Sequence, residues 1–366
     1  MRILHLDPDD MDNPLSGGGP VRTFEIYRRL ARRHEVTVLT PTFPGSTPEC
    51  VREGVRYVRL GRRIRNHGSS HHITFFFALP AAVRRFPHDL LVEDLMPPMS
   101  ATLTPLVATR PLIASVQWFF ARTLTRQFHL PFTLGERHGV RMYRNAVLLT
   151  AAMRNRFAAM HPHANCVVIP NGVEDGLFTL PQVPGNGILY IGRLDFAQKG
   201  LDLLLRAYAM MPERPPLVLA GHGFEGGQVS ALARRLGVLE TISLPGRVDA
   251  ATRARLLQEC RFVCVPSRDE TFGMVISEAC AAGKPVVLFD KAPMNEVAAP
   301  DACSVVPPFD VAAYSAAMQR LSRLSDAAIL TLGASCRAWA QHYRWDAVAA
   351  AQESFYEGVL CAQGAA

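Results

Sequence analysis

Lysine is nearly missing from this chain, which has three lysines among its 39 basic residues. The other 36 are arginines, so an amine at any position stands out against the rest of the sequence. One of the three, Lys199, lies between a strand-like apolar run and an apolar helix pattern. An amine there is unusual for this chain, and one interpretation of it is a lysine that only caps a loop.

Long hydrophobic runs are missing as well. No apolar stretch approaches the ~20 residues that a membrane-spanning helix needs. The longest one, residues 73–83, is interrupted by Pro80. The chain does not open on a basic segment followed by an apolar one, because residues 1–6 have the pattern of a β-strand. These features predict a cytoplasmic protein.

The sequence shows no familiar metal motif. Of the eight cysteines, Cys260 and Cys264 are four residues apart, but no second cysteine or histidine pair follows at the spacing of a zinc finger. Cys166, Cys264 and Cys280 lie in apolar runs and are expected to be packed thiols. The acidic run from Asp7 to Asp10 is interpreted as the loop after the first strand. We therefore expect no metal and no other cofactor.

Positive charge is concentrated in the first half of the chain. Residues 1–170 contain 22 arginines and 12 acidic residues, a net charge of +10, whereas residues 171–366 carry −3. No nucleic-acid-binding motif accompanies the arginines, so we expect no nucleic-acid partner. The surplus forms either solvated helix faces or a surface for an anionic membrane or acceptor. The second interpretation would place the protein peripherally at the inner face of the membrane.

Strand-like and helix-like patterns alternate along the whole chain. In the first half, strands are expected at residues 1–6, 36–39, 90–92, 112–116 and 147–150, a helix at 21–33, and surface loops at 42–48 and 61–72. Such alternation is typical of parallel sheets, and 366 residues suffice for two domains with substantial cores. The sequence therefore predicts an α/β protein with two Rossmann-like parallel-sheet domains facing an interdomain cleft.

The most informative segment is Phe262–Val287. A buried strand pattern is followed by a loop with Glu270, and then by a helix pattern that begins near Phe272 or Gly273 and carries Glu278. Open parallel sheets bind ligands beyond the carboxyl ends of their strands, and a helix N-terminus there suits a diphosphate. Two carboxylates beside the phosphates would bind the hydroxyls of a sugar nucleotide. For two glutamates alone, a helix with an acidic first turn is the alternative.

Together with its neighbours, this segment resembles the retaining GT-B glycosyltransferases of family GT4. Its Glu-x7-Glu spacing, from Glu270 to Glu278, is similar to the family signature. Further matches come in the family's order: Ser16–Pro20, Ile169–Val173, Ile188–Leu194, Lys199–Leu204, Leu217–Gly223 and Ile242–Val248. The resemblance implies an acceptor-binding domain at residues 1–172, a donor domain at 173–340, and a C-terminal helix within 341–366 that crosses back to the first domain.

The resemblance also implies roles for individual residues. Arg193 and Lys199 would neutralise the donor diphosphate and the charge that grows on the leaving group. Glu270, the third catalytic candidate, would contact hydroxyls of the donor sugar, and Glu278 would bind the ribose. The other candidate donor-binding residues are Thr271, Phe272, Gly273 and Met274, and Gly17, Gly18 and Gly19 in the first domain, unless that glycine turn only ends a loop.

The reaction implied by the resemblance is sugar transfer with retention of configuration. It proceeds by front-face attack without a metal, from a nucleotide diphosphate, with a UDP-sugar favoured, to a hydroxyl acceptor. That acceptor would be a glycan, a lipid-linked glycan or a small metabolite. Its choice is expected to depend on first-domain loops at residues 61–75 and 118–135.

One position departs from the family pattern. Many members carry a histidine after the strand that ends near residue 116, close to the donor sugar, where this chain has Gln117 and Trp118. Glutamine can hydrogen-bond a sugar hydroxyl but cannot carry a proton as histidine does. Gln117, Trp118 and, at the hinge, Asn171 are candidates for the acceptor side of the cleft.

Other functions remain open on the sequence. The basic first half and the missing histidine suit a non-catalytic nucleotide-sugar-binding or membrane-scaffold protein. A GT-B epimerase or phosphorylase would need further acid–base groups at the cleft, which the sequence does not indicate. A nicotinamide dehydrogenase is disfavoured, because no Gly-x-Gly-x-x-Gly motif with a downstream ribose-binding acid opens either half.

Overall fold

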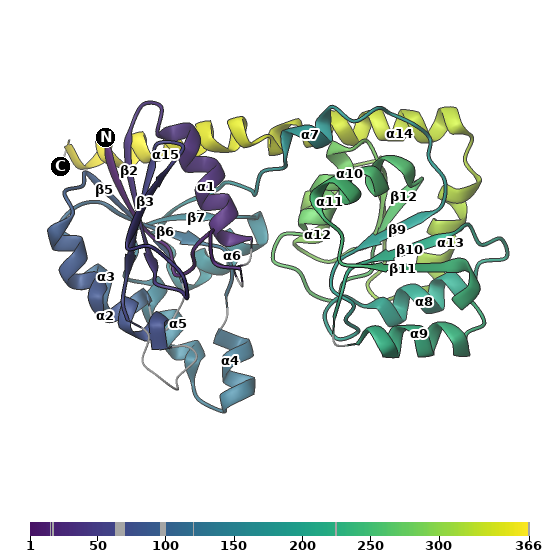
Figure 1. The fold of residues 1–366 in the computed structure, drawn as a ribbon, viewed down its shortest axis with the longest axis horizontal. Coiled ribbons are helices and arrows are strands. Elements are labelled where there is room, and N and C mark those ends of the chain that lie inside the picture. Colours follow the sequence, from purple (N-terminus) through teal and green to yellow (C-terminus); the bar gives the residue numbers. More distant parts are fainter. Residues whose placement is uncertain are drawn as a thin grey trace. The chain divides into compact units, whose positions relative to one another are not determined.

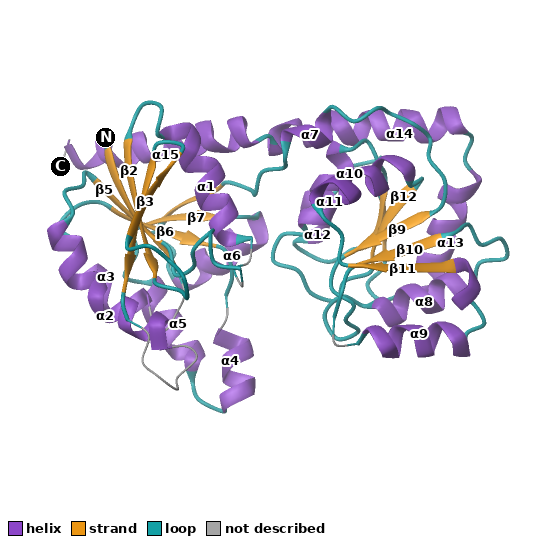
Figure 2. Cartoon of the chain, viewed as in Figure 1, coloured by secondary structure: helices purple, strands orange, loops and turns teal. Residues whose placement is uncertain are grey.

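The computed structural model describes residues 1–14, 16, 18–62, 70–95, 100–119, 121–223 and 225–364 (Figure 1). The chain divides into two compact units: the first comprises Met1–Asn171 with Trp345–Ala366, and the second comprises Gly172–Arg344. In each unit, helices lie on both faces of a central sheet (Figure 2). Parallel sheets need this cover because both of their faces are apolar. The predicted α/β class is confirmed.

The first unit is built on an eight-stranded sheet. Its strands are β1 (Arg2–Leu6), β2 (Glu35–Pro41), β3 (Glu49–Arg52), β4 (Val55–Leu60), β5 (Leu90–Asp94), β6 (Leu112–Val116), β7 (Asn145–Leu148) and β8 (Asn165–Val168). They follow the order β3-β4-β2-β1-β5-β6-β7-β8, and all pairs are parallel except the hairpin of β3 and β4. The sequence did not predict β3, because three of its four residues are exposed and no buried face marks it.

The helices of the first unit are α1 (Gly19–Leu30), α2 (Ser70–Arg85), α3 (Ser100–Val107), α4 (Ala121–Phe128), α5 (Phe132–Val140), α6 (Ala151–Met160) and α15 (Trp345–Gly364). Most of them pack on the two faces of the sheet, whereas α4 contacts α5 (Figure 1). Successive strand residues point to opposite faces. Ile3 of β1 therefore packs with Tyr27 of α1 and Tyr356 of α15. Its neighbour Leu4 packs with Phe75 of α2 on the other face.

Helix α2 corrects one prediction about a loop. Residues 70–72, expected in the loop 61–72, form the first turn of α2, and residues 63–69 lie outside the described part. The helix extends beyond its apolar run because Phe75, Leu79 and Val83 are buried in the core and hold the following turns in place. Across the described residues, no helix combines the length and the apolarity needed to cross a membrane.

A buried arginine ties the C-terminal helix into the first unit. Arg22 of α1 is 3% exposed. Its guanidinium donates to the carbonyl oxygens of Ile169 and Pro170 at 3.1 and 2.5 Å, and to Oε1 of Gln352 in α15 at 3.2 Å. A guanidinium can satisfy several acceptors in one plane, so Arg22 joins α1, the end of the β8 segment and α15.

Several clustered arginines are neutralised within this unit. Arg29 pairs with Asp346 at 2.5 Å and with Glu25 at 2.6 Å, and Arg28 pairs with Glu25 at 2.8 Å. Arg33 forms an ion pair with Glu353 of α15. Part of the positive surplus expected for a solvated or membrane-facing surface therefore holds α15 against α1.

The second unit is built on a six-stranded sheet in which every pair is parallel. Its strands are β9 (Ile188–Ile191), β10 (Leu217–Ala220), β11 (Ile242–Gly246), β12 (Phe262–Val265), β13 (Val286–Phe289) and β14 (Ser304–Val306), in the order β11-β10-β9-β12-β13-β14. The helices are α7 (Asp175–Phe178), α8 (Leu201–Ala209), α9 (Gly226–Arg235), α10 (Ala250–Glu259), α11 (Met274–Ala281), α12 (Met294–Val297), α13 (Val311–Arg323) and α14 (Asp326–Trp339). Short 3-10 turns lie at Leu239–Thr241 and Ala340–Tyr343.

Candidate functional site

The second unit has a topological switch point between β9 and β12. From β9 the chain continues outward to β10 and β11, and it then returns to the other side of β9 with β12, β13 and β14. Open parallel sheets bind ligands at such points, beyond the carboxyl ends of the strands. The predicted site residues Arg193 and Lys199 follow β9, and the segment Glu270–Met274 follows β12.

Gly200 allows the two loops at the switch point to touch. Its φ is +65°, which side-chain-bearing residues rarely adopt, and a Cβ here would lie 2.1 Å from the carbonyl oxygen of Pro266. The close approach carries Lys199 against the loop after β12, where its Nζ lies 2.6 Å from Oε1 of Glu270. The structure thus brings together two predicted catalytic residues that are 71 positions apart.

The pair of Lys199 and Glu270 offers a cation and a hydrogen-bond acceptor side by side. Oε1 of Glu270 also accepts a hydrogen bond from Oγ of Ser267 at 2.8 Å. Both partners use the same oxygen, so Oε2 can accept a ligand hydroxyl. The ammonium of Lys199 has three donors, so it can bind Glu270 and an anion together. The side chains are 19% and 13% exposed, which shelters the pair yet keeps it accessible.

Helix α11 begins immediately beyond this pair. It starts at Met274, one or two residues after the predicted start, because Gly273 has a φ of +94° and caps the helix in a left-handed conformation. Phe272 is buried, with its ring edge-on to Tyr343 at 5.8 Å. That packing anchors the segment, which presents Thr271 half-buried and Met274 exposed. The first turn of α11 has main-chain N–H groups that no helical carbonyl accepts.

Glu278 lies within α11 and has a partner that the sequence did not indicate. Its Oε1 accepts a hydrogen bond from Nη1 of Arg253 in α10 at 2.8 Å, and Nη2 of Arg253 lies 3.2 Å from Glu174. Burial raises the pKa of Glu278, the charge of Arg253 lowers it, and Glu174 raises it; the net shift is upward. Arg253 therefore helps to keep a buried carboxylate ionised where a ribose-binding acid was predicted.

Arg193 lies apart from the carboxylates. Its side chain is 59% exposed, and its Nη1 lies 3.8 Å from Asp195. Its Nη2 donates to the side-chain oxygen of Gln198. An exposed guanidinium on the loop that also carries Lys199 is accessible to a diphosphate, and its predicted role remains a prediction.

The first unit has its own switch point, between β1 and β5. Three buried ionisable residues meet there: His5, Asp7 and Asp94, whose ligand-type atoms lie within 4.8 Å of one another. Nε2 of His5 is 3.3 Å from Asp94, and Nδ1 of His5 is 2.7 Å from the hydroxyl of Tyr27. Burial and then the charge of Asp94 raise the pKa of Asp7 well above its ordinary value.

Most polar atoms of these groups have protein partners; within the described part of the chain, Nε2 of His5 and Oδ1 of Asp94 face each other without a hydrogen bond. We therefore interpret the groups as a hydrogen-bond network rather than a cation site. Thr23 donates to Oδ2 of Asp7 at 2.8 Å, and the main-chain N–H of Asp9 donates to Oδ1 at 3.0 Å. Gln117 donates to Oδ2 of Asp94 at 2.7 Å. The network joins β1, α1, β5 and the end of β6 beneath the loop that leads into α1.

Gln117 approaches the glycine loop of the first unit. A Cβ built on Gly19 would lie 3.2 Å from Oε1 of Gln117, so a side chain at position 19 would crowd the amide. Gly18 is the residue before α1, and Gly17 lies outside the described residues. Trp118 is 38% exposed. Asn171 accepts a hydrogen bond from Arg22 at 3.2 Å, which ties it to the packing of α1.

Comparison with known proteins places the chain in a family. Residues 16–176 match the profile of Glycosyltransferase Family 4, and residues 181–329 match that of Glycosyl transferases group 1. A phosphatidyl-myo-inositol mannosyltransferase of Mycobacterium leprae (strain TN) is 30% identical over 379 residues, covering 98% of this chain and 97% of the relative. This chain belongs to glycosyltransferase family 4. The predicted family is confirmed.

Further relatives of this family 4 glycosyltransferase agree in sequence and in fold. A D-inositol 3-phosphate glycosyltransferase of Xylanimonas cellulosilytica is 30% identical over 213 residues, which cover 52% of this chain and 50% of the relative. The sucrose-phosphate synthase of Thermosynechococcus elongatus superposes with a TM-score of 0.79 at 20% identity, covering 99% of each chain. Anabaena HepE with UDP and glucose gives 0.74 at 18% identity, covering 97% of this chain and 98% of HepE. The likeness to these structures confirms the GT-B fold.

Three residues near the candidate site were not predicted from the sequence. Ser267 is the second residue after β12, and this place beyond a buried strand is its sequence signal. Asp94 is the last residue of the buried strand β5, and a carboxylate at the carboxyl end of such a strand is a signal of a possible site. Arg253 could not be predicted as a site residue, because nothing in the sequence of α10 indicates that its side chain faces a glutamate 25 residues later.

Proposed function

We propose that this protein is a retaining hexosyltransferase that moves a sugar from a nucleoside diphosphate to a hydroxyl of an anionic acceptor, without a metal. The observation that carries the proposal is the sheltered pair of Lys199 and Glu270 at the switch point of the second unit, directly before α11. A cation, hydroxyl-accepting carboxylates and free helix N–H groups together suit the three parts of a sugar nucleotide.

Each residue has a defined task in this proposal. Lys199 and the exposed Arg193 stabilise the negative charge that grows on the departing diphosphate. Oε2 of Glu270 accepts hydroxyls of the transferred sugar, and Glu278, kept ionised by Arg253, accepts the ribose hydroxyls. Gly273 and Met274 present their main-chain N–H groups to the phosphates. The departing phosphate takes the acceptor proton, so no protein nucleophile is required.

The acceptor is assigned to the first unit and is an inositol phosphate or an inositol phospholipid. Two relatives carry inositol acceptors in their names, a phosphatidyl-myo-inositol and a D-inositol 3-phosphate. A net charge of +10 on residues 1–170 suits such anionic acceptors. On α2, the exposed apolar side chains Ile73 and Phe77 precede the exposed Arg84 and Arg85. That combination favours peripheral contact with an anionic membrane.

The test combines ligand binding with turnover. The melting temperature of wild type and Lys199→Ala is measured with UDP, GDP, ADP and dTDP. UDP is the nucleotide that we expect to bind. The UDP- and GDP-hexoses are then assayed for transfer to inositol phosphates and to phosphatidylinositol vesicles. A shift with one diphosphate that is lost in the variant, followed by sugar transfer, supports the proposal. The absence of both would overturn it.

A non-catalytic sugar-nucleotide-binding protein is the second candidate. The observation that favours it is Gln117, which stands where many family members have a histidine and which is engaged by Asp94. Nucleotide binding that depends on Lys199, without transfer of sugar to any acceptor or to water, would select this candidate over the transferase.

A further inference from the structure

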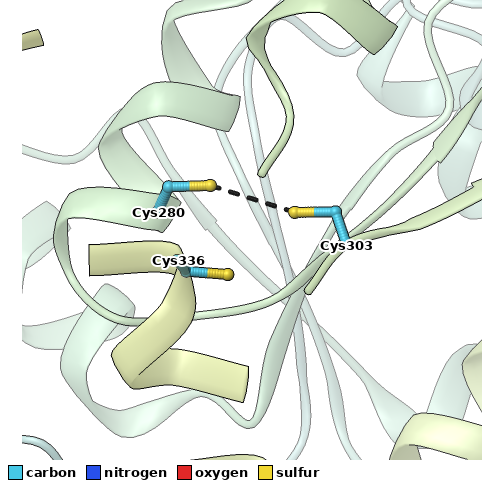
Figure 3. Close-up of side chains that lie close together, drawn as sticks. All are labelled: Cys280, Cys303 and Cys336. Atoms are coloured by element: carbon cyan, nitrogen blue, oxygen red, sulfur yellow. Dashed lines mark hydrogen bonds between the residues drawn. The ribbon is translucent and has the colours of Figure 1, made fainter. Parts of the chain in front are cut away.

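Three cysteine sulfurs converge in the second unit (Figure 3). Cys280 lies in α11, Cys303 immediately precedes β14, and Cys336 lies in α14. Their Sγ atoms all lie within 4.8 Å of one another, and those of Cys280 and Cys303 are 3.9 Å apart. The side chains point into one shared space from three separate elements. This cluster could not be predicted from the sequence, because its members are 23 and 33 residues apart and match no zinc-finger spacing.

The distance between the sulfurs suits a metal ion better than a covalent bond. A zinc–sulfur bond is about 2.3 Å, which places two sulfurs of a tetrahedral site about 3.8 Å apart. A disulfide requires about 2.05 Å between the sulfurs. Two packed thiols also lie near 3.9 Å, so the distance alone does not decide. The convergence of a third sulfur on the same space is what distinguishes the cluster from a packed pair.

We propose that Cys280, Cys303 and Cys336 form a binding site for a thiophilic d10 cation, with Zn²⁺ as the resident ion. Thiolates are the preferred ligands of such ions. Three thiolates supply three corners of a tetrahedron. Cys280 and Cys336 are buried, whereas Cys303 is partly exposed, so the fourth corner and the route of entry lie on the side of Cys303.

An arginine is held next to the cluster. Arg337, the residue after Cys336, donates to the carbonyl oxygens of Ala281 and Ala282 at 3.1 Å each. Its guanidinium is therefore fixed at the C-terminal end of α11, close in sequence to Cys280, where it offsets part of the negative charge.

A cation in this place would act on the fold of the second unit. It would link the end of α11 to β14 and α14, in addition to the hydrogen bonds that Arg337 of α14 makes to the end of α11. Glu278 lies two residues before Cys280 on α11, so the same link would restrain the carboxylate assigned to the ribose. The binding of the cation does not rest on the proposed transferase function. An effect of the cation on nucleotide affinity does rest on that function, because it assumes that Glu278 binds the nucleotide.

The experiment uses the full chain, reduced and freed of metal. Co²⁺ is titrated as a spectroscopic probe, and thiolate-to-cobalt charge-transfer absorption in the near ultraviolet is recorded. Zn²⁺ content is measured on protein purified without chelator. We expect one Zn²⁺ per chain, a cobalt band that saturates at one equivalent, and a higher melting temperature with Zn²⁺. Cys303→Ser should abolish the band, whereas Cys166→Ser, at a half-buried cysteine outside the cluster, should retain it.

Several results would overturn the site. These are wild type without stoichiometric Zn²⁺ and without a cobalt band, a band that survives Cys303→Ser, or a Cys280–Cys303 disulfide formed in air in place of metal binding. If Cys303→Ser does not fold, alkylation of wild type by iodoacetamide decides. Zn²⁺ should then protect Cys303, the partly exposed member of the cluster, and leave Cys166 reactive. Equal reactivity of Cys303 with and without Zn²⁺ would exclude the site, whatever the outcome for sugar transfer.

Discussion

Asp94 holds the side-chain amide of Gln117 in one orientation. Oδ2 of Asp94 accepts a hydrogen bond from Nε2 of Gln117 at 2.7 Å. Because the NH₂ group donates this hydrogen bond, it faces the carboxylate, and the carbonyl oxygen of the amide faces away. That oxygen lies beside Gly19. Where a family histidine would present a ring that can carry a proton, this protein presents a fixed, neutral acceptor.

Gln117 should therefore contribute to catalysis by orienting a ligand hydroxyl, and Lys199 should contribute by its positive charge. Gln117→Ala is expected to lower kcat/KM about 10-fold, since it removes one hydrogen bond of ordinary strength. Lys199→Ala should lower it about 100- to 1,000-fold, because it removes a charge aimed at the leaving group. Steady-state kinetics of both variants test which substitution lowers kcat/KM more. Arg323→Ala, at an exposed residue paired with Glu213, serves as control. A greater loss at Gln117 than at Lys199 would contradict this division of roles.

Gly200 should be essential for bringing Lys199 to Glu270. Gly200→Ala is expected to cost about 3 kcal/mol of unfolding free energy, because the new Cβ combines left-handed strain with overpacking against Pro266. Chemical denaturation measures the cost, and nucleotide affinity should fall with it.

Gly237→Ala is the matched control for Gly200→Ala. Gly237 has a similar φ of +70°, but nothing lies within 4 Å of its Cβ position. The substitution there should cost about 1 kcal/mol, which is the conformational cost alone, and should leave nucleotide binding unchanged. Equal losses at the two positions would show that the contact with Pro266 is unimportant.

Arg253 should set the pH range of nucleotide binding through Glu278. Burial raises the pKa of Glu278 and the charge of Arg253 lowers it, with a net upward shift. Nucleotide affinity should therefore fall as the pH drops through this raised pKa. Arg253→Ala should move the loss to higher pH and weaken binding at neutral pH. Calorimetric titration of the diphosphate between pH 5 and 8 measures both effects.

Arg255→Ala is the control for this pH dependence. Arg255 lies on the same helix, and its partner is Glu259 at 2.7 Å rather than Glu278. The pH profile of the Arg255→Ala variant should coincide with that of wild type. If Arg253→Ala and Arg255→Ala behave alike, Glu278 is not the group that titrates.

A buried carboxyl in the first unit should make stability depend on pH. Burial raises the pKa of Glu93 to about 8, against the opposing hydrogen bonds from Tyr143 and Thr104. The unfolded chain releases this proton near pH 4.5, so between pH 4.5 and 8 the native state binds more protons, and stability falls as pH rises. Glu93→Gln, which stays neutral, should flatten this fall by on the order of a few kcal/mol.

Denaturation curves at several pH values between 5 and 8 test the role of Glu93. Glu49→Gln provides a contrast, because Glu49 is exposed and hydrogen bonds from Arg56 lower its pKa. Any stabilisation by the Glu49 carboxylate is lost only as the pH falls below the ordinary pKa of a glutamate. The Glu49→Gln variant should therefore show the same pH dependence of stability as wild type between pH 5 and 8. Wild-type stability that does not change over this range would refute the assignment of a proton to Glu93.

Much of the fold could be predicted from the sequence, because buried strands and amphipathic helices leave regular patterns. Strands β1, β6 and β12 follow such patterns closely. β3 and the first turn of α2 do not, since an exposed edge strand has no buried face and a helix end depends on what its later turns bury. Glu270 and Glu278 could be found because they lie in one continuous segment with a recognisable spacing.

The sequence by itself determined the α/β class, the family and the segment that carries the acidic pair, because all three depend on local order along the chain. Only the tertiary structure decided that Lys199 lies against Glu270, that Arg253 faces Glu278, that Asp94 orients Gln117 and that three distant cysteines meet. The side chains in each of these contacts lie on different elements, and the elements are brought together by strand order and by close approaches such as that of Gly200 to Pro266. Local spacing carries no record of such contacts, because their distances are set by packing across the sheet.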